Sequence, residues 1–404
     1  MAAESSIIEA ASGIRPCANV PLAIYVHVPW CVAKCPYCDF NSHVLKGGVP
    51  AARYVTAVLA DLDFELALLP AAARAISVFF GGGTPSLLAP EWVERLLAGI
   101  RARVPLVADA EVTLEANPGT IEHGRFAEYA AAGINRVSLG VQSFDDAKLA
   151  RLGRIHSACE AVIAAEELRR AGLDNFNLDL MYALPGQDAA GASDDVRKAV
   201  ALAPAHISWY ELTLEPGTAF YRRPPKLPRE EEAARIEEAG REELLAAGYE
   251  RYEISAFARP GRRCRHNDNY WGYGDYIGLG PGAHGKRSKG SAIVRTIRVL
   301  SPDRYLREAG SAAALSETRS IPPAERSFEF LLGALRRVKG FRWEEFEDRT
   351  GLSRRALAIR LRTASHCENL IAWRAEGPRP TARGLDFLNE VLNRLLPAPN
   401  APNS

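Results

Sequence analysis

The chain alternates short apolar runs with stretches that carry apolar residues at helical spacing. The strand-like runs in its first half are residues 23–27, 76–80, 111–115, 136–142, 175–180 and 206–212. Between the first two runs, apolar side chains recur every three or four positions, as at Tyr54, Val58 and Leu62. Such alternation is typical of parallel strands joined by right-handed helical crossovers. The sequence therefore predicts an α/β fold in which six strands form an incomplete barrel, a partial (β/α)6 barrel of the TIM type.

Changes of pattern along the 404 residues predict four parts. A disordered N-terminus, the partial barrel, an extension of the sheet that includes the segment HNDNYW, and a small C-terminal α+β module are expected at residues 1–20, 21–250, 251–320 and 321–397, in that order. Further strands are expected at 249–254 and 293–299.

The C-terminal module is predicted to be mainly helical. After short helices, we expect a helix capped by Ser353 that runs through Leu361, a turn at 377–380 and a final helix at 381–396. This order resembles a winged-helix module.

Composition and charge exclude several function classes. With 50 basic and 49 acidic side chains, the chain has no global field that favours nucleic acid or an anionic membrane. No apolar run approaches the roughly 18 residues of a membrane span. The first 16 residues also lack the basic start and apolar stretch of a signal peptide. We therefore expect a cytoplasmic protein, whose association with membranes would be peripheral and through partner proteins.

Three of the seven cysteines, Cys31, Cys35 and Cys38, follow the first strand-like run with the spacing C-x3-C-x2-C. This clustering points to metal or redox chemistry in a reducing compartment, since seven cysteines are too few for a disulfide scaffold. Three thiolates on one tight loop can ligate three irons of a cubic cluster and leave the fourth iron open. The alternative is a zinc site completed by His27 or His43, but no second ligand pair follows at matching spacing. The isolated thiols, to which we assign no role, are Cys17, Cys159, Cys264 and Cys367.

Polar or glycine-rich residues stand where the other strands end. The second strand is followed by GGGTP at 81–85, and the next three end in Glu115, Gln142 and Asp179. Singly, a strand-end carboxylate could cap a helix, and Arg154 could be an ordinary solvated arginine. Because the carboxyl ends of barrel strands meet on one face, these groups are predicted to line one cavity with the cysteine loop.

These residues lie in a set of distinctive segments. The segments are IYVHVPWCVAKCPYCDFNSH, FFGGGTPSLL, LEANPGT, NRVSLGVQSF, LGRIH, NFNLDLMYALPGQ and HNDNYW. With them, the chain from about residue 25 to 388 resembles the radical S-adenosylmethionine (SAM) superfamily, in its oxygen-independent coproporphyrinogen III oxidase-like branch and closest to the haem chaperones of that branch. The combination is far more specific than the cysteine spacing alone.

The resemblance implies a [4Fe–4S] cluster on Cys31, Cys35 and Cys38, with the amino and carboxylate groups of SAM on the open iron. The residues that it assigns to SAM are Tyr25, Tyr37, Gly82, Gly83, Thr84, Glu115, Gln142, Arg154 and Asp179. The two glycines would let the backbone approach the methionine part of SAM, beside the Thr84 hydroxyl. Arg154 would pair with the SAM carboxylate and Glu115 with its amino group.

The remaining implied SAM contacts concern the ribose and the adenine. Gln142 and Asp179 suit the ribose hydroxyls, and Tyr25 and Tyr37 would pack near the cluster and the adenine. Whether SAM is cleaved is left open by the sequence, and so is a radical enzyme activity on another substrate.

Position 40 separates two functions within this branch. The oxidases carry a further cysteine two places after the third ligand and a longer N-terminal segment that helps to hold a second SAM. Here the position is Phe40, and only about two dozen residues precede the first strand. Both departures weaken the alternative of a radical oxidative decarboxylase.

The segment HNDNYW at 266–271 favours haem, because imidazole is a common axial ligand of haem iron and the haem chaperones carry this motif. His266 is the haem candidate. From its chemistry alone, the motif favours a loop cap with Tyr270 and Trp271 as packing residues, and the resemblance reverses this preference for haem binding. We expect a haem chaperone that passes haem to respiratory membrane haemoproteins or bacterioferritin-type storage proteins. A homodimer is a further expectation of the resemblance.

A nucleic-acid-binding protein is the alternative of another class. Arg354, Arg355, Arg360 and Arg362 lie in a helix-turn-helix-like stretch. Residues 321–404 contain 14 basic and 10 acidic side chains, a surplus too small for a DNA-binding face. We therefore expect a packing or partner-docking module rather than nucleic-acid binding.

Overall fold

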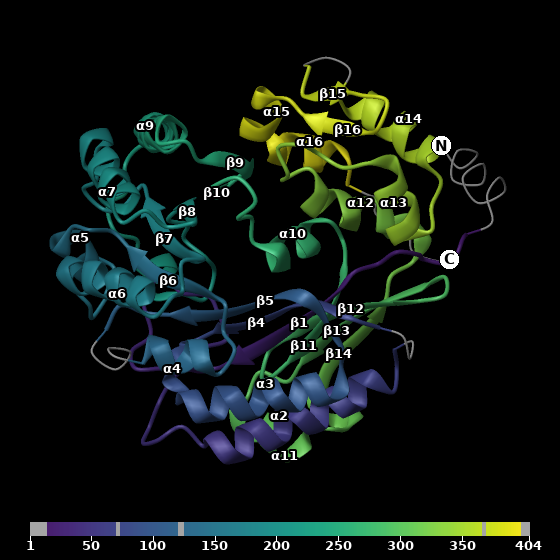
Figure 1. The fold of residues 1–404 in the computed structure, drawn as a ribbon. Coiled ribbons are helices and arrows are strands. Elements are labelled where there is room, and N and C mark those ends of the chain that lie inside the picture. The colour runs from purple at the N-terminus through teal and green to yellow at the C-terminus, as the bar shows by residue number, and fades with distance from the viewer. Residues whose placement is uncertain (1–13, 70–72, 120–124, 366–368, 397–404) are drawn as a thin grey trace.

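A computed structural model describes residues 14–69, 73–119, 125–365 and 369–396 (Figure 1). Its centre is one twelve-stranded sheet with the order β14-β13-β12-β11-β1-β4-β5-β6-β7-β8-β10-β9. The six predicted strands are confirmed as neighbouring parallel strands: β1 (Leu22–Val28), β4 (Ala75–Gly82), β5 (Leu106–Ala116), β6 (Arg136–Gln142), β7 (Phe176–Tyr182) and β8 (His206–Glu211). The sheet is open, with β14 and β9 at its two edges.

Later segments extend the sheet at both edges. Beyond β8 lie β10 (Ala256–Ala258) and β9 (Glu250–Glu253), both antiparallel. Beyond β1 lie the parallel β11 (Asp275–Leu279) and the antiparallel β12 (His284–Lys289), β13 (Ala292–Arg298) and β14 (Leu315–Ser320). The strands predicted at 249–254 and 293–299 are confirmed as β9 and β13, which lie at opposite edges.

Helices between the parallel strands pack on one face of the sheet. They are α2 (Ala51–Leu66), α3 (Pro90–Arg103), α4 (Phe126–Ala131), α5 (Asp146–Arg151), α6 (Ala158–Arg170) and α7 (Ala189–Ala201), with the short η1 (Pro85–Leu87) after β4. The predicted apolar spacing of α2 is confirmed, since Tyr54, Val58 and Leu62 are fully buried. In Figure 1, α2, α3 and α11 (Pro302–Glu308) cover the same part of this face.

The remaining elements complete the sheet's surroundings. They are β2 (Trp30–Cys31) and β3 (His43–Val44) around the cysteine loop, then α8 (Ala219–Arg222), α9 (Glu230–Ala246), α10 (Arg265–Trp271) and η2 (Ala312–Ala314). Helix α10 lies on the face opposite α2 and α3, packed near β4 and β1 (Figure 1).

The C-terminal residues form a second hydrophobic core around Phe330, Phe341 and Phe346. Their elements are α12 (Pro323–Ala334), α13 (Trp343–Thr350), α14 (Arg354–Ser365), β15 (Ile371–Trp373), β16 (Pro378–Pro380), α15 (Ala382–Asp386) and α16 (Leu388–Arg394). The predicted turn at 377–380 is wrong, because 378–380 pair with β15 as strand β16. The final helix is divided into α15 and α16 at Phe387. The winged-helix assignment and the four domain boundaries stay predictions.

Three of the four arginines considered for nucleic acid make contacts inside this C-terminal part. Arg354 pairs with Glu347 at 3.2 Å, Arg360 donates to the Leu395 carbonyl at 2.8 Å, and the Arg362 guanidinium lies 5.1 Å from the centre of the Trp373 ring. These contacts support the packing interpretation.

The N-terminal segment contacts this part as well. The backbone N–H groups of Arg15 and Ala18 donate to the carbonyls of Gly351 and Asp348, and that of Cys17 donates to the carbonyl of Gly290 in the β12–β13 turn. The first 13 residues of the predicted disordered end, 1–13, lie outside the described residues, as does Cys367. Within the described ranges, no helix is both long and apolar enough to cross a membrane.

Candidate cluster and cofactor site

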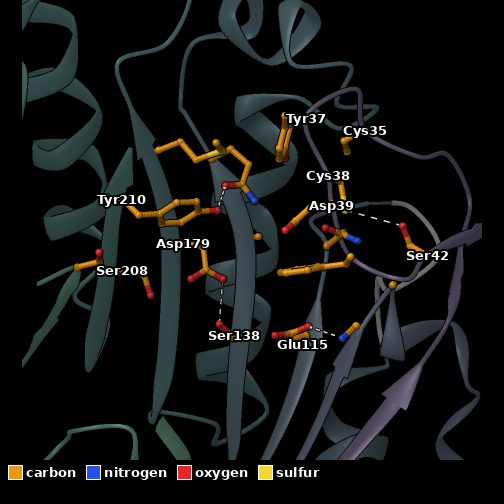
Figure 2. A pocket seen from close by; sticks show the side chains of 18 of the residues that line it. Cys35, Tyr37, Cys38, Asp39, Ser42, Glu115, Ser138, Asp179, Ser208 and Tyr210 are labelled. Atoms are coloured by element: carbon orange, nitrogen blue, oxygen red, sulfur yellow. Dashed lines mark hydrogen bonds between the residues drawn. The ribbon is translucent and has the colours of Figure 1, made fainter. Parts of the chain in front are cut away.

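A cavity of about 430 Å³ opens at the carboxyl ends of the parallel strands. Figure 2 shows the cysteine loop on one side of it, facing Asp179 and Tyr210 on the other. The predicted site residues that line the cavity are Cys31, Cys35, Cys38, Tyr37, Gly82, Gly83, Thr84, Glu115, Gln142, Arg154 and Asp179. Tyr25 and His266 do not line it. The prediction that these strand ends share one cavity is therefore confirmed by their positions.

The cysteine loop is held in shape by backbone pairing with its own flanks. The Leu45 N–H donates to the Cys31 carbonyl at 2.9 Å, and the Cys38 N–H donates to the Cys35 carbonyl at 3.2 Å. The three thiols are free, and burial raises the pKa of Cys31 and of Cys38. A metal or cluster would reverse that shift, because a coordinating thiol is deprotonated.

The bonding of His27 does not favour its use as a zinc ligand. The Nε2 of His27 lies 2.9 Å from the Asn41 carbonyl and its Nδ1 lies 2.9 Å from the Tyr25 hydroxyl, so both ring nitrogens are engaged. Over the described parts of the chain, no three Cys, His, Asp or Glu side chains are placed to share a single metal ion. Three separate thiols around one cavity suit a cluster with several irons better.

The close approach of residues 27–30 leaves no room for a side chain at Gly82 or Gly83. A Cβ on Gly83 would lie 2.6 Å from the Trp30 carbonyl oxygen, and a Cβ on Gly82, whose φ is +114°, would lie 2.6 Å from the His27 ring. The Gly83 and Thr84 N–H groups donate to the Val28 and Trp30 carbonyls at 2.7 and 2.8 Å. These glycines therefore have a further role: they let the end of β4 pack closely against the start of the cysteine loop.

We expect Gly83→Ala to destabilise the fold by ~1–3 kcal/mol, because the new Cβ must displace backbone at Trp30. The melting temperature, and the iron content after anaerobic reconstitution, would both fall. Gly48→Ala is the matched control, since no atom lies within 4 Å of a Cβ there. Equal melting temperatures for both variants would contradict the close approach.

Glu115 is a half-buried carboxyl group between the glycine loop and Asp179. Its Oε2 accepts from the Gly82 N–H at 3.0 Å. Burial, with the nearby charge of Asp179, raises the pKa of Glu115 from 4.5 to about 8. Asp179 itself accepts from the Ser138 hydroxyl at 2.9 Å and from the Asn177 amide at 2.8 Å. Glu115 is therefore protonated at neutral pH in the free protein, and a cationic ligand would favour its ionised form.

We expect Glu115→Gln to stabilise the protein increasingly as pH rises from about 5 to about 8. The folded chain holds a proton on Glu115 that the unfolded chain loses above its ordinary pKa of 4.5, so the wild type loses stability through this range and levels off above the folded pKa of about 8. Denaturant midpoints of both proteins, measured without SAM, test this. A difference between them that does not change with pH would contradict the raised pKa.

Arg154 lines the cavity and is held there by neighbouring groups. Its Nη2 donates to the Asn117 side-chain oxygen at 2.5 Å and to the Gly140 carbonyl at 2.7 Å, and its Nη1 lies 3.7 Å from the Cys35 sulfur. Its Nε is buried without a hydrogen-bond partner among the described residues. A guanidinium whose Nε is buried and unused fits an anionic group of a ligand, as expected for the SAM carboxylate.

Three residues that the sequence analysis did not select complete the site. Asn117 donates to the Thr84 hydroxyl at 3.0 Å while accepting from Arg154, so it joins two predicted residues. Tyr210 donates to Gln142 at 2.7 Å, and Ser138 donates to Asp179 (Figure 2). Asn117 stands in the segment LEANPGT and Tyr210 near the end of β8, so their strand-end positions are the signal that could have found them.

The two tyrosines take different positions. Tyr37 lies on the cavity wall, with its ring 6.4 Å from that of Phe220, and burial raises its pKa. Tyr25 does not line the cavity, and its ring stacks on Phe79 with centroids 6.2 Å apart. Tyr25 therefore supports the residues behind the cavity in this conformation, whereas Tyr37 faces into it.

Helix α10, which carries HNDNYW, forms the far wall of the same cavity through Asn267 and Trp271. His266 points away from the cavity into the sheet, where its Nδ1 lies 3.0 Å from the Ser77 hydroxyl and its ring packs on Phe79 at 4.8 Å. Burial and the positive charge of Arg136 lower the pKa of His266 to about 3. The imidazole is therefore neutral, and in this conformation it is not presented to a ligand in the cavity.

The comparisons with known proteins agree with this arrangement. The sequence model of the Radical SAM superfamily matches residues 25–203. The heme chaperone HemW of Escherichia coli is 46% identical over 378 residues, which cover 93% of this chain and 98% of the relative. The chain belongs to the HemW family. The match of HemW spans the cysteine loop, the strand ends and the C-terminal part together.

Two further likenesses extend the HemW match. Radical S-adenosyl methionine domain-containing protein 1, mitochondrial, of Mus musculus is 36% identical over 94% of this chain and 88% of that protein. The structure of coproporphyrinogen III oxidase (HemN) from Escherichia coli, a radical SAM enzyme, superposes with a TM-score of 0.78 over 97% of this chain and 93% of that chain. At 21% identity it shows the shared fold alone. Membership of the radical SAM superfamily implies a [4Fe–4S] cluster and SAM.

Proposed function

We propose that this protein is a haem chaperone that holds a [4Fe–4S] cluster on Cys31, Cys35 and Cys38, binds SAM beside it and carries haem to acceptor proteins. The observation that carries the proposal is a single cavity that runs from the three thiols to Asn267 and Trp271 of the HNDNYW helix. The name of its relatives, heme chaperone HemW, supports the haem part.

Different residues of the cavity would bind different groups of SAM. Arg154, with its unpaired Nε, would hold the carboxylate of SAM, and Glu115 would ionise against its amino group. Gln142 and Asp179 would take the ribose hydroxyls, and Tyr37 would cover the cluster side. When bound, the cluster and SAM supply one-electron chemistry at the sulfonium group.

Further parts of the proposal concern partners and place. We propose delivery of haem to respiratory membrane haemoproteins or bacterioferritin-type storage proteins, in the cytoplasm and at the membrane surface, by a homodimer. Phe40 lines the cavity where the oxidases have a cysteine, which favours carriage of haem over oxidative decarboxylation.

Two measurements on oxygen-protected, reconstituted protein test the proposal. The electron paramagnetic resonance signal of the reduced protein should change when SAM is added, because SAM reaches the open iron. Haem titration should give a stable complex, and His266→Ala should weaken it only if this buried histidine turns outward to become the ligand. Absence of a stable haem complex, together with turnover of coproporphyrinogen III, would instead identify an oxidase.

A further inference from the structure

The end of the cavity remote from the cysteines has its own charged pair. Arg154 and Arg336 are the two cationic side chains among the described residues that line the cavity, and Arg154 belongs to the cysteine end. Arg336 and Glu253 line the cavity together with Trp271 and Asn267 of helix α10. This end therefore combines an aromatic ring with a guanidinium.

Arg336 is positioned by the backbone of the segment that follows α12. The Arg336 N–H donates to the Gly333 carbonyl at 3.0 Å, and the Val338 N–H donates to the Tyr252 carbonyl at 3.0 Å. Residue 337 also pairs with residue 253 as an isolated antiparallel bridge. The C-terminal part thus places the guanidinium against the edge strand β9, at a fixed point of the cavity wall.

The bonding of Arg336 is incomplete. Its Nη2 forms an ion pair with Glu253 Oε1, while its Nε is buried without a hydrogen-bond partner in the described chain. The Glu253 side chain is only 1% exposed and its Oε2 already accepts from the Ser255 N–H at 2.9 Å. The neighbouring Arg337 differs, since both of its Nη atoms are engaged by Glu345 at 2.7 and 2.9 Å. Arg336 therefore has a buried Nε without an acceptor, whereas both Nη atoms of Arg337 bind Glu345 and its Nε lies 3.7 Å from Asp268.

We propose that Arg336 recognises the carboxylate side chains of haem, with Glu253 as its counter-ion while the cavity is empty. This inference rests on the proposed haem function. Haem is a planar apolar ring with two propionate groups on one edge, and an arginine fork is the preferred partner of a carboxylate. Trp271 offers an aromatic surface for the ring beside that fork. The two arginines then separate the ligands: Arg154 takes the carboxylate of SAM and Arg336 takes that of haem.

Haem and haem dimethyl ester, in which both propionates are blocked, are the probes that test this. The wild type should bind haem ~10- to 100-fold more tightly than the ester, the range of one charge-assisted hydrogen-bond set. Arg336→Gln should reduce this ratio to near one. Glu253→Gln should bind haem more tightly than the wild type does, because the competing carboxylate is removed. It should bind the ester as tightly as the wild type does. Arg374→Gln, an exposed arginine of the C-terminal part outside the cavity, should keep the wild-type ratio.

Comparison of ratios cancels the different solubility of the two probes. Since Arg336→Gln leaves the buried Glu253 without its ion pair, the double variant Glu253→Gln with Arg336→Gln provides a neutral pair, and it should also show a ratio near one. Iron content and melting temperature confirm that each variant is folded. A wild-type ratio near one, or an unchanged ratio in both Arg336 variants, would overturn the role of Arg336 and leave the chaperone intact. A wild type that binds neither probe would overturn the proposed function itself.

Discussion

Cys35→Ala should abolish the cluster: bound iron is expected to fall from ~4 atoms per chain to near zero, with loss of the broad visible absorption. Cys35 is one of three thiols on a single loop, and its sulfur lies 3.7 Å from the Arg154 guanidinium. With one thiolate removed, only two protein ligands remain for a cluster that needs three. Iron, acid-labile sulfide and the visible spectrum of anaerobically reconstituted protein measure the effect.

The control for this prediction is Cys159→Ala. Cys159 is an exposed thiol of α6 outside the cavity, so its removal should leave iron and spectrum unchanged. Unchanged iron in Cys35→Ala would remove Cys35 from the ligand set. Stoichiometric zinc without iron or sulfide in the wild type would refute the cluster altogether.

Arg154→Lys should weaken SAM binding by ~10- to 100-fold, even though the positive charge is kept. The guanidinium spans Asn117, Gly140 and Cys35 and still has an unpaired Nε, a geometry that a single ammonium group cannot reproduce. Calorimetric titration of SAM into reconstituted protein measures the change. Iron content should be largely retained, because Arg154 supplies no ligand atom.

Arg170→Lys is the matched control for Arg154. Arg170 lies on α6 in an exposed ion pair with Glu166 at 2.8 Å, and its replacement should leave SAM affinity within about twofold of wild type. If Arg154→Lys bound SAM as tightly as this control, Arg154 would have only a structural role beside the cysteine loop. Loss of iron in Arg154→Lys would lead to the same conclusion.

Much of the site follows from local sequence. The period of apolar residues predicted the six parallel strands, and their adjacency placed Glu115, Gln142 and Asp179 at one edge. Parallel strands leave no choice about where their carboxyl ends meet, so residues far apart in the chain were assigned to one cavity without a structure. The cysteine loop follows β1 directly, so its position at the same edge of the sheet could also be predicted.

Other features depend on contacts that no local pattern contains. Strand β11 is a five-residue element that pairs in parallel with β1 although some 250 residues separate them. Helix α10 could have presented either face to the cavity, and packing against Phe79 and Ser77 turned Asn267 and Trp271 inward and His266 away.

The sequence by itself determined the cysteine loop and the polar strand ends, since both depend on spacing within single segments and on the common direction of parallel strands. Only the tertiary structure decided the far end of the cavity, where Arg336 meets Glu253 across 83 positions. Ion pairing at that distance requires the C-terminal part to dock on β9, and docking depends on the shape of two complete hydrophobic surfaces rather than on any run of residues.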